Sequence, residues 1–295
     1  MPWGRILTAM VTPFTVDGKL DLDGAGKLAR YLIDHGSDGL VVAGTTGESP
    51  ALRHEEKTAL FRAVKEAVGD RAAVIAGTGT NSTAASIELS REAEALGVDG
   101  LMLVVPYYNR PSQEGLYQHF RAVAGAVNLP IILYNIPSRT GRNMDAATTL
   151  RLAAINNIVA VKEASGDLDQ ATAIIRDAPA GFRLYSGDDS LTLPLMAVGG
   201  YGIISVAAHV AGAKMQAMVQ AFVRGEADRA AALHRELFPL FKTLFITSNP
   251  VPVKEALQIL GLPAGPVRLP LVAASAAERE KVAIALKEAG ILPVG

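Results

Sequence analysis

A lysine stands where a short apolar run ends. Lys162 follows Ile158–Val161, and a strand's period of two would place Ile158, Ala160 and Lys162 on one face. An ammonium group inside an apolar interior is costly, so burial should lower the pKa of this lysine and leave a neutral amine. A neutral amine is the nucleophile that forms a Schiff base with a carbonyl compound. The ordinary alternative is a strand-end lysine whose amine reaches solvent.

Other polar side chains also sit at the ends of apolar runs or in the loops that follow them. Tyr134 ends one such run, and a phenol next to the lysine could carry protons while a carbinolamine loses water. Thr45 and Thr46 offer hydroxyl and backbone N–H groups at an expected helix entrance, which suits a small carboxylate. Arg139 could hold a carboxylate through two hydrogen bonds. Each also has an ordinary interpretation, as a core tyrosine, a plain βα turn or a solvated arginine.

Several other chemistries lack the residues that they need. The five histidines are scattered without metal-ligand spacing, and the chain has no cysteine for a thiolate ligand, a disulfide or a nucleophile. Asp188 and Asp189 are adjacent, so their side chains should diverge and make a poor acid–base pair. The segment Gly77–Ser82 is too weak a match for a dinucleotide-binding loop. We therefore expect neither a metal nor an organic cofactor.

Short apolar runs, many of them rich in β-branched residues, recur along most of the chain. The runs are Ile6–Val11, Leu40–Ala43, Ala73–Ala76, Leu101–Val105, Ile131–Tyr134, Ile158–Val161, Arg183–Tyr185 and Ile203–Val206. Amphipathic segments of helical period separate them, so strands and helices alternate. Eight such repeats predict a TIM (β/α)8 barrel. An open doubly wound sheet is the alternative, but it often carries a glycine-rich turn after its first strand, where this chain has Val11–Phe14.

A TIM barrel carries its chemistry at the carboxyl ends of its strands. That rule places five segments, which are far apart in the sequence, at the same open end of the barrel, called its mouth below. They are Gly44–Glu48, Tyr107–Tyr108, Tyr134–Asn135, Lys162–Glu163 and Gly187–Asp189.

The chain continues beyond what a barrel requires. Gly212–Val223 would supply the last barrel helix, and three more helical runs follow it. These runs are Asp228–Phe245, Val253–Leu260 and Ala276–Ala289. We therefore expect a catalytic barrel over residues 1–224 and a C-terminal helical extension over residues 225–295.

Composition and charge restrict the partners and the compartment. The net charge is −1 and no run of clustered basic residues is present, so the sequence does not predict electrostatic attraction of nucleic acid. Leu191–Ala213 has no charged residue, but Pro194 and Gly199–Gly200 interrupt it, which predicts a helix, a turn and a buried strand instead of a membrane span. The N-terminus lacks the apolar core of a signal peptide. These features predict a soluble, cytoplasmic protein with no membrane partner.

Taken together, the motifs resemble a known family. The most specific are GTTGE at 44–48, YNIPSRTG at 134–141 and VKEAS at 161–165, in that order. They are similar to those of the pyruvate-dependent aldolase superfamily, and within it most of all to the 4-hydroxy-tetrahydrodipicolinate synthase (dihydrodipicolinate synthase) family. The resemblance runs from Ile6 to the last helix and includes YSGDDS at 185–190 and NPVPVK at 249–254.

The resemblance implies an aldol condensation without a cofactor. Pyruvate would form an imine with Lys162, and the derived enamine would attack L-aspartate 4-semialdehyde. Tyr134 would be the general acid and base, linked to Thr45 and Tyr108 as a proton relay. In this family the tyrosine that corresponds to Tyr108 reaches in from a neighbouring subunit, and the assembly is a homotetramer built as a dimer of dimers.

The resemblance also implies the binding residues. Thr46 would bind the carboxylate of pyruvate, Gly187 and Ile204 would line the pocket, and Arg139 would hold the carboxylate of the semialdehyde.

Two alternative functions remain open from the sequence. One is a sugar-acid aldolase such as N-acetylneuraminate lyase or 2-keto-3-deoxy-gluconate aldolase, against which the S-R-T-G arrangement around Arg139 argues. The other is a non-catalytic barrel that binds a keto acid, which would need no proton relay.

Inhibited members of the family bind L-lysine, the end product of the pathway in many organisms, in a cleft between subunits. Their contacts correspond to Ser49, Pro50, Lys57, Asn81, Ala85 and Tyr107. Lys57 stands where those enzymes have a histidine, and Ala85 where they have a glutamate. Ala85 cannot pair with the ammonium group of the ligand, and Lys57 adds a like charge near it.

We predict that L-lysine at about 1 mM leaves the activity nearly unchanged, because its ammonium group loses a partner and gains a repelling charge. The measurement is a titration of L-lysine at sub-saturating pyruvate. Strong inhibition well below that concentration would show that another acidic group replaces the missing glutamate.

Overall fold

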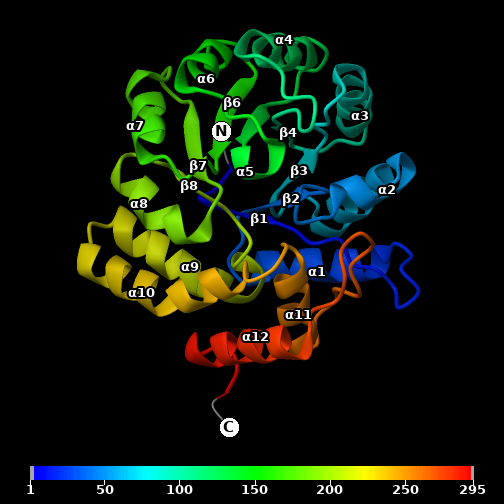
Figure 1. Ribbon diagram of the computed structural model, residues 1–295, viewed down its shortest axis with the longest axis vertical. Coiled ribbons are helices and arrows are strands. Elements are labelled where there is room, and N and C mark those ends of the chain that lie inside the picture. The colour runs from blue at the N-terminus through cyan, green and yellow to red at the C-terminus, as the bar shows by residue number, and fades with distance from the viewer. Residues whose placement is uncertain (1–2, 294–295) are drawn as a thin grey trace.

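The eight apolar runs form the eight strands of a closed parallel barrel in the computed structural model, which describes residues 3–293 (Figure 1). The strands are β1 (Ile6–Ala9), β2 (Gly39–Val42), β3 (Ala73–Gly77), β4 (Gly100–Val104), β5 (Ile131–Asn135), β6 (Ile158–Glu163), β7 (Arg183–Ser186) and β8 (Gly202–Ser205). Each strand pairs with the next along the chain, and β8 pairs with β1. The prediction of a TIM barrel is confirmed, and the alternative of an open sheet was wrong.

Helices surround the barrel and follow its strands in chain order. They are α1 (Leu22–Asp34), α2 (His54–Val68), α3 (Thr83–Ala95), α4 (Gln113–Ala124), α6 (Ala146–Ala153), α7 (Leu168–Asp177), α8 (Thr192–Ala197) and α9 (Ala208–Val223). Five of them have a capping residue directly before the first turn. The side chain of this residue accepts a hydrogen bond from a backbone N–H of that turn, which would otherwise have no partner. These capping residues are Asp21, Ser82, Ser112, Asp145 and Asp167.

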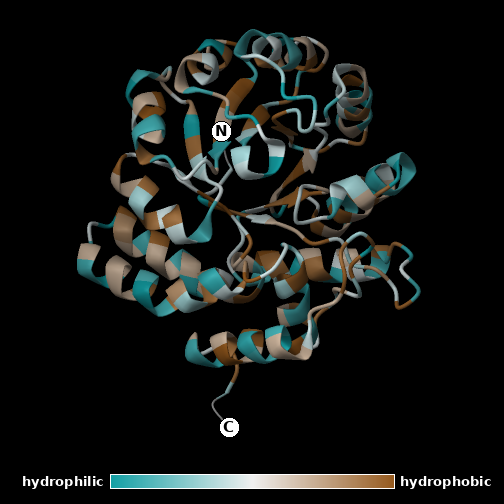
Figure 2. Ribbon diagram, in the orientation of Figure 1, coloured by the Kyte–Doolittle hydropathy of each residue, from teal (hydrophilic) through white to brown (hydrophobic). Residues whose placement is uncertain are grey.

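The barrel strands are buried on both faces, as the apolar runs predicted. Alternate residues fill the inside of the barrel, and the others pack against the helices. Figure 2 shows apolar strands at the centre and helices with mixed polar and apolar surfaces around them. The inner cluster includes Leu7, Val41, Ile75, Ile132, Tyr134, Ala160, Tyr185 and Ile204.

The pairing of β5 with β6 contains a register shift. Ile131 pairs with Ile158, whereas the next residue, Ile132, pairs with Ala160. One additional residue in β6 therefore interrupts the alternation of faces, as a β-bulge does. Ile158 packs in the outer core, while Ala160 belongs to the inner cluster. The prediction that Ile158 shares a face with Ala160 and Lys162 was wrong for this reason.

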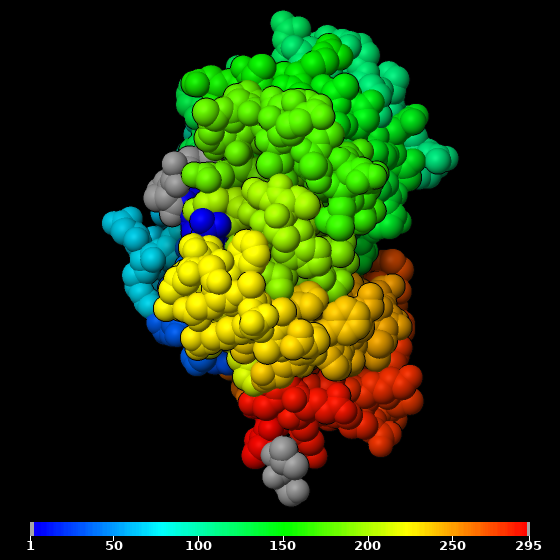
Figure 3. Space-filling view, turned by 90° about the vertical axis from the view of Figure 1, so that its left-hand side faces the viewer, coloured from blue at the N-terminus to red at the C-terminus, as the bar shows by residue number. Residues whose placement is uncertain are grey.

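The C-terminal segment forms the three predicted helices, α10 (Ala227–Thr243), α11 (Val251–Ile259) and α12 (Ala276–Glu288). They lie together at one end of the molecule, in yellow to red (Figure 3). The most extensive contact of α10 is with α9, and α12 packs on both α10 and α11. The preceding helix α9 begins at Ala208, earlier than the predicted Gly212, and is interrupted by a non-helical Ala211. The boundary between residues 224 and 225 stays a prediction.

The uncharged segment Leu191–Ala213 contains the expected helix, turn and buried strand, as α8, a turn at Gly199–Gly200 and β8, and its last residues begin α9. Between residues 3 and 293, no helix is long and apolar enough to cross a membrane.

Two other short elements lie near the mouth of the barrel. They are the helix α5 (Pro137–Thr140) after β5 and the 3₁₀ turn η1 (Ser49–Ala51) after β2. A second 3₁₀ turn, η2 (Asp189–Leu191), leads into α8.

A buried ion pair ties the C-terminal segment to the loop after β2. The Nζ of Lys254 lies 2.6 Å from Oε1 of Glu48, and the two side chains are 2% and 1% exposed. The backbone N–H of Arg268 donates to the other carboxylate oxygen of Glu48 at 2.9 Å. The Arg268 side chain in turn binds the carboxylate of Glu56 through two hydrogen bonds of 2.7 and 2.8 Å. The positive groups of Lys254 and Arg268 each lie 4.2 Å from the centre of the Phe14 ring.

We predict that Lys254→Met lowers the free energy of unfolding by about 3–5 kcal/mol, because it leaves the Glu48 carboxylate buried without its partner. Denaturant unfolding measures the loss. Lys19→Met is the matched control, since Lys19 pairs with Asp17 at the surface and its side chain is 81% exposed. An exposed pair should change stability by about 1 kcal/mol or less. Equal effects of the two substitutions would show that removing Lys254 leaves no costly unpaired charge at Glu48.

Candidate active site

Lys162 lies inside the barrel mouth with its amine against an aromatic ring. Its residue is 4% exposed, and its Nζ lies 4.3 Å from the centre of the Tyr134 ring. The two residues are direct neighbours in the pairing of β5 with β6. Burial lowers the pKa of Lys162 from 10.5 to about 8, the charge of Asp189 opposes this shift, and the charge of Arg139 adds to it. A sizeable fraction of the amine is therefore neutral near pH 8.

Tyr134 remains a protonated phenol over the same pH range. Burial raises its pKa to about 12, and the nearby charge of Arg139 and a hydrogen bond with Thr45 partly oppose this rise. A phenol that keeps its proton next to a neutral amine is arranged to donate that proton to a group bound at the amine.

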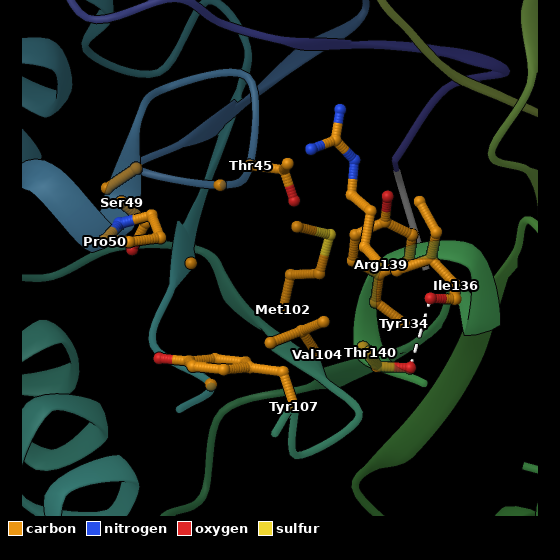
Figure 4. Close-up of a pocket in the computed structure, with 14 residues that line it drawn as sticks. Thr45, Ser49, Pro50, Met102, Val104, Tyr107, Tyr134, Ile136, Arg139 and Thr140 are labelled. Atoms are coloured by element: carbon orange, nitrogen blue, oxygen red, sulfur yellow. Dashed lines mark hydrogen bonds between the residues drawn. The ribbon is translucent and has the colours of Figure 1, made fainter. Parts of the chain in front are cut away.

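A cavity of about 250 Å³ opens beside Tyr134, which lines it, whereas Lys162 contacts the Tyr134 ring without lining the cavity itself. It lies where a TIM barrel carries its chemistry, among the loops at the carboxyl ends of β2 to β5. Tyr134 and Arg139 lie on one side of it and Ser49 and Pro50 on the opposite side, with Thr45 and Tyr107 between them (Figure 4). The other lining residues are Ala43, Gly44, Gly77, Gly79, Met102, Val104, Ile136 and Thr140.

Thr46 is buried in the loop next to Thr45, and its hydroxyl contacts the C-terminal segment. Its Oγ1 accepts a hydrogen bond of 2.9 Å from Nδ2 of Asn249. The prediction that Thr45 and Thr46 stand at a helix entrance was wrong. Hydrogen bonds from the N–H groups of Glu48 and Ser49 close a turn here, the 3₁₀ turn η1 follows, and α2 begins only at His54.

Gly187 and Ile204 lie within the walls around Lys162 and Tyr134. A Cβ atom at Gly187 would lie 3.2 Å from Cε of Lys162 and 2.6 Å from Cβ of Ala164, so a larger residue would displace the lysine or the loop. Ile204 is buried in the same inner cluster as Tyr134. The sequence therefore named two residues that shape the site, although neither lines the open cavity.

Tyr108 is the predicted catalytic residue that a single chain does not bring to Lys162. It is 89% exposed, and its φ of +73° is a conformation that costs a bulky residue energy. Residues in such conformations persist where the surrounding structure holds them, and they cluster at functional sites. Within one chain, the structure thus assembles Lys162, Tyr134 and Thr45 and leaves Tyr108 exposed.

Asp189 belongs to this arrangement as well, although the sequence predicted no role for it. Asp188 and Asp189 do diverge as expected, since Asp188 accepts from Ser190 at the start of η2 while Asp189 turns inward. The buried Asp189 carboxylate accepts from the Ser205 hydroxyl and from the N–H groups of Val206 and Ala207. Burial raises its pKa to about 6. Its position directly after a strand end was the available signal.

Asn249 begins the motif NPVPVK, but nothing in the local sequence indicates what its side chain does. Asn249 pairs with a residue 203 positions away, and its main-chain carbonyl oxygen lies 3.5 Å from Nη2 of Arg139.

In the part of the chain that the structure describes, no group of three or more His, Asp or Glu side chains could hold a metal ion.

Comparison with known proteins gives one consistent family. The sequence model of the Dihydrodipicolinate synthetase family matches residues 2–289. A protein of Moorella thermoacetica named 4-hydroxy-tetrahydrodipicolinate synthase is 85% identical over 292 residues, which cover 99% of this chain and 100% of that protein. The solved dihydrodipicolinate synthase of Bacillus anthracis is 51% identical with a TM-score of 0.95 and coverages of 97% and 98%. The enzyme of Cyanidioschyzon merolae, solved with lysine bound, is 48% identical with a TM-score of 0.97 and coverages of 98% and 99%.

We predict that the amine of Lys162 becomes reactive around pH 8, because only the neutral form is nucleophilic and burial disfavours the ammonium form. Reductive methylation with formaldehyde at a series of pH values, followed by peptide mass spectrometry, gives the midpoint. Lys19 is an internal control, since its ion pair with Asp17 raises its pKa above 10.5. If the labelling of the two lysines had the same pH midpoint, burial would not lower the pKa of Lys162.

Proposed function

The chain belongs to the dihydrodipicolinate synthetase family, and we propose that it catalyses the 4-hydroxy-tetrahydrodipicolinate synthase reaction. This lyase of the class I aldolase type condenses pyruvate with L-aspartate 4-semialdehyde. The observation that carries the proposal is the buried Lys162 amine, with a pKa lowered to about 8, against the ring of Tyr134. The name of the relative at 85% identity gives the same reaction.

The first half of the reaction attaches pyruvate to the enzyme. The neutral amine of Lys162 attacks the ketone carbon of pyruvate and forms a carbinolamine. The phenol of Tyr134 donates a proton to the departing hydroxyl, which leaves as water, and a protonated imine remains. Because Tyr134 holds its proton at neutral pH, it can act as the acid in this step.

The second half forms the new carbon–carbon bond. The protonated imine draws electrons from the methyl group of pyruvate, which loses a proton to the phenolate left on Tyr134 and gives an enamine. The enamine carbon attacks the aldehyde carbon of the semialdehyde, and the aldehyde oxygen takes up a proton from the phenol of Tyr134, which has a hydrogen bond with Thr45. The amine of the new product chain then displaces Lys162 from the imine carbon and closes the ring.

Two carboxylates have to be recognised, one on each substrate. We assign the pyruvate carboxylate to Thr46 and the pocket wall to Gly187 and Ile204. Arg139 would hold the carboxylate of the semialdehyde, since its side chain lines the same cavity as Tyr134. A planar guanidinium suits a carboxylate through two hydrogen bonds, which favours the semialdehyde over the sugar aldehydes of the related aldolases. A barrel that only binds a keto acid, without catalysis, would not need the acid–base pair of Lys162 and Tyr134.

We infer that the active assembly is a homotetramer, a dimer of dimers in which Tyr108 completes the site of a neighbouring subunit. The exposure and strained backbone of Tyr108 support this inference. We expect the enzyme to act in the cytoplasm, where pyruvate is a central metabolite, as part of lysine (diaminopimelate) biosynthesis.

Incubation with pyruvate and borohydride should add a reduced pyruvate group to Lys162 and abolish activity, because borohydride traps the imine as a stable amine. Peptide mass spectrometry locates the adduct, and borohydride without pyruvate is the control. Lys162→Arg should lose several orders of magnitude in rate, since a guanidinium stays protonated and forms no imine. An unmodified Lys162 with full activity, or a preference for sugar aldehydes in a parallel assay, would refute the proposal.

Mixing inactive Lys162→Ala with inactive Tyr108→Phe subunits should restore part of the activity. Each mixed dimer then contains one site with its own Lys162 and the partner's intact tyrosine. Lys162→Ala mixed with Tyr134→Phe is the matched control and should stay inactive, because one chain supplies both of those residues. Recovery in both mixtures, or full activity of a monomer, would contradict the shared site.

A further inference from the structure

Asn249 connects the C-terminal segment to both of the residues that we assign to substrate carboxylates. Its side-chain Nδ2 donates to Oγ1 of Thr46 at 2.9 Å, and its main-chain oxygen accepts from Nη2 of Arg139 at 3.5 Å. Asn249 is 6% exposed and Thr46 is 3% exposed, so water does not compete freely for the contact between their side chains.

The direction of this hydrogen bond determines what the Thr46 hydroxyl can do. A hydroxyl group has one proton and two lone pairs, whereas an amide nitrogen can only donate. The hydrogen bond from Asn249 therefore occupies a lone pair of Oγ1 and leaves the proton available. Across residues 3–293, no hydrogen bond of the structure uses that proton.

We propose that Asn249 is a positioning residue that fixes the Thr46 hydroxyl as a donor to the carboxylate of pyruvate. This inference rests on the proposed function, in which Thr46 binds that carboxylate. A carboxylate can only accept hydrogen bonds, so a hydroxyl that gave its proton to a protein acceptor would turn lone pairs toward it. With a donor at position 249, the proton remains for the substrate.

The same two segments are held together by the buried ion pair. Glu48 lies two residues after Thr46, and Lys254 lies five residues after Asn249. Directly after Thr46, the hydroxyl of Thr12 donates to the carbonyl of Gly47 at 2.7 Å. The chain that follows Thr46 is thus fixed at Gly47 and Glu48, and the chain that follows Asn249 is fixed at Lys254, before substrate arrives. This avoids part of the entropy cost of ordering Thr46 and Asn249 during binding.

The two contacts of Asn249 can be separated by substitution. Every residue at position 249 keeps the main-chain oxygen that accepts from Arg139, but only the asparagine side chain supplies the donor to Thr46. A change of the side chain should therefore weaken the binding of pyruvate much more than that of the semialdehyde.

The test begins with Asn249→Ala and Asn249→Asp. We expect the KM for pyruvate to rise roughly ten-fold in the alanine variant and up to about 100-fold in the aspartate variant, the range for a hydrogen bond to a charged group. Aspartate has the shape of asparagine but accepts the proton of Thr46 and adds a repelling charge. The KM for the semialdehyde should change by less than about three-fold in Asn249→Ala, because a purely structural defect would affect both substrates.

A double-mutant cycle then asks whether Asn249 acts through the hydroxyl of Thr46. In a Thr46→Val background, which lacks the hydroxyl, Asn249→Ala should no longer change the KM for pyruvate. In the matched Thr46→Ser background, which keeps the hydroxyl, it should still raise that KM roughly ten-fold. Equal effects in the two backgrounds, or an unchanged pyruvate KM in Asn249→Ala, would overturn the inference.

The pyruvate adduct on wild-type Lys162 separates this inference from the proposed function. If the wild-type enzyme forms no adduct with pyruvate and borohydride, the proposed function fails. If it forms the adduct and Asn249→Ala forms it at the same pyruvate concentrations, only the inference about Asn249 fails.

Discussion

The cost of placing an ammonium group among apolar side chains governs the whole site. Lys162 is 4% exposed, so water solvates its charge poorly and its amine loses a proton far more easily than that of a surface lysine. The barrel supplies this environment because its strands are covered on both faces, and the inner cluster reaches up to Tyr134. A buried carboxylate at Asp189 moderates the effect, since its charge favours the protonated form of Lys162. Apolar packing and the charges of Asp189 and Arg139 together set the balance between an amine that attacks and an imine that must become protonated.

A second constraint comes from outside the barrel. The loop after β2 carries Thr45 and Thr46, and the C-terminal segment holds it through a neutral hydrogen bond and a buried ion pair. Buried charges of this kind contribute little net stability compared with apolar packing, but they permit only one arrangement of their partners. The C-terminal extension therefore takes part in shaping the substrate pocket, besides adding helices to the outside of the barrel.

The strands and the position of Lys162 could be predicted because they depend on local patterns. Apolar runs of strand length repeat eight times, and the rule that barrel chemistry lies at strand ends selected Tyr134 and Lys162. Ile158 was placed on the wrong face because a bulge leaves no mark in the composition of a strand. The helix entrance expected at Thr46 failed because a turn with its own hydrogen bonds intervenes. Asn249 could not be predicted, since its importance arises from a contact between distant parts of the chain.

The barrel mouth depends on contacts with the C-terminal segment, and the ribosome synthesises this segment after the whole barrel. The ribosome completes all eight strands before it reaches Asn249 and Lys254, and α9 and α10 lie between. A nascent chain can therefore close its barrel while the carboxylate of Glu48 still has no cation beside it. Neither the buried ion pair nor the hydrogen bond of Asn249 with Thr46 can form until the later residues emerge. The contacts that position the Thr46 hydroxyl are therefore among the last to form as the chain is synthesised.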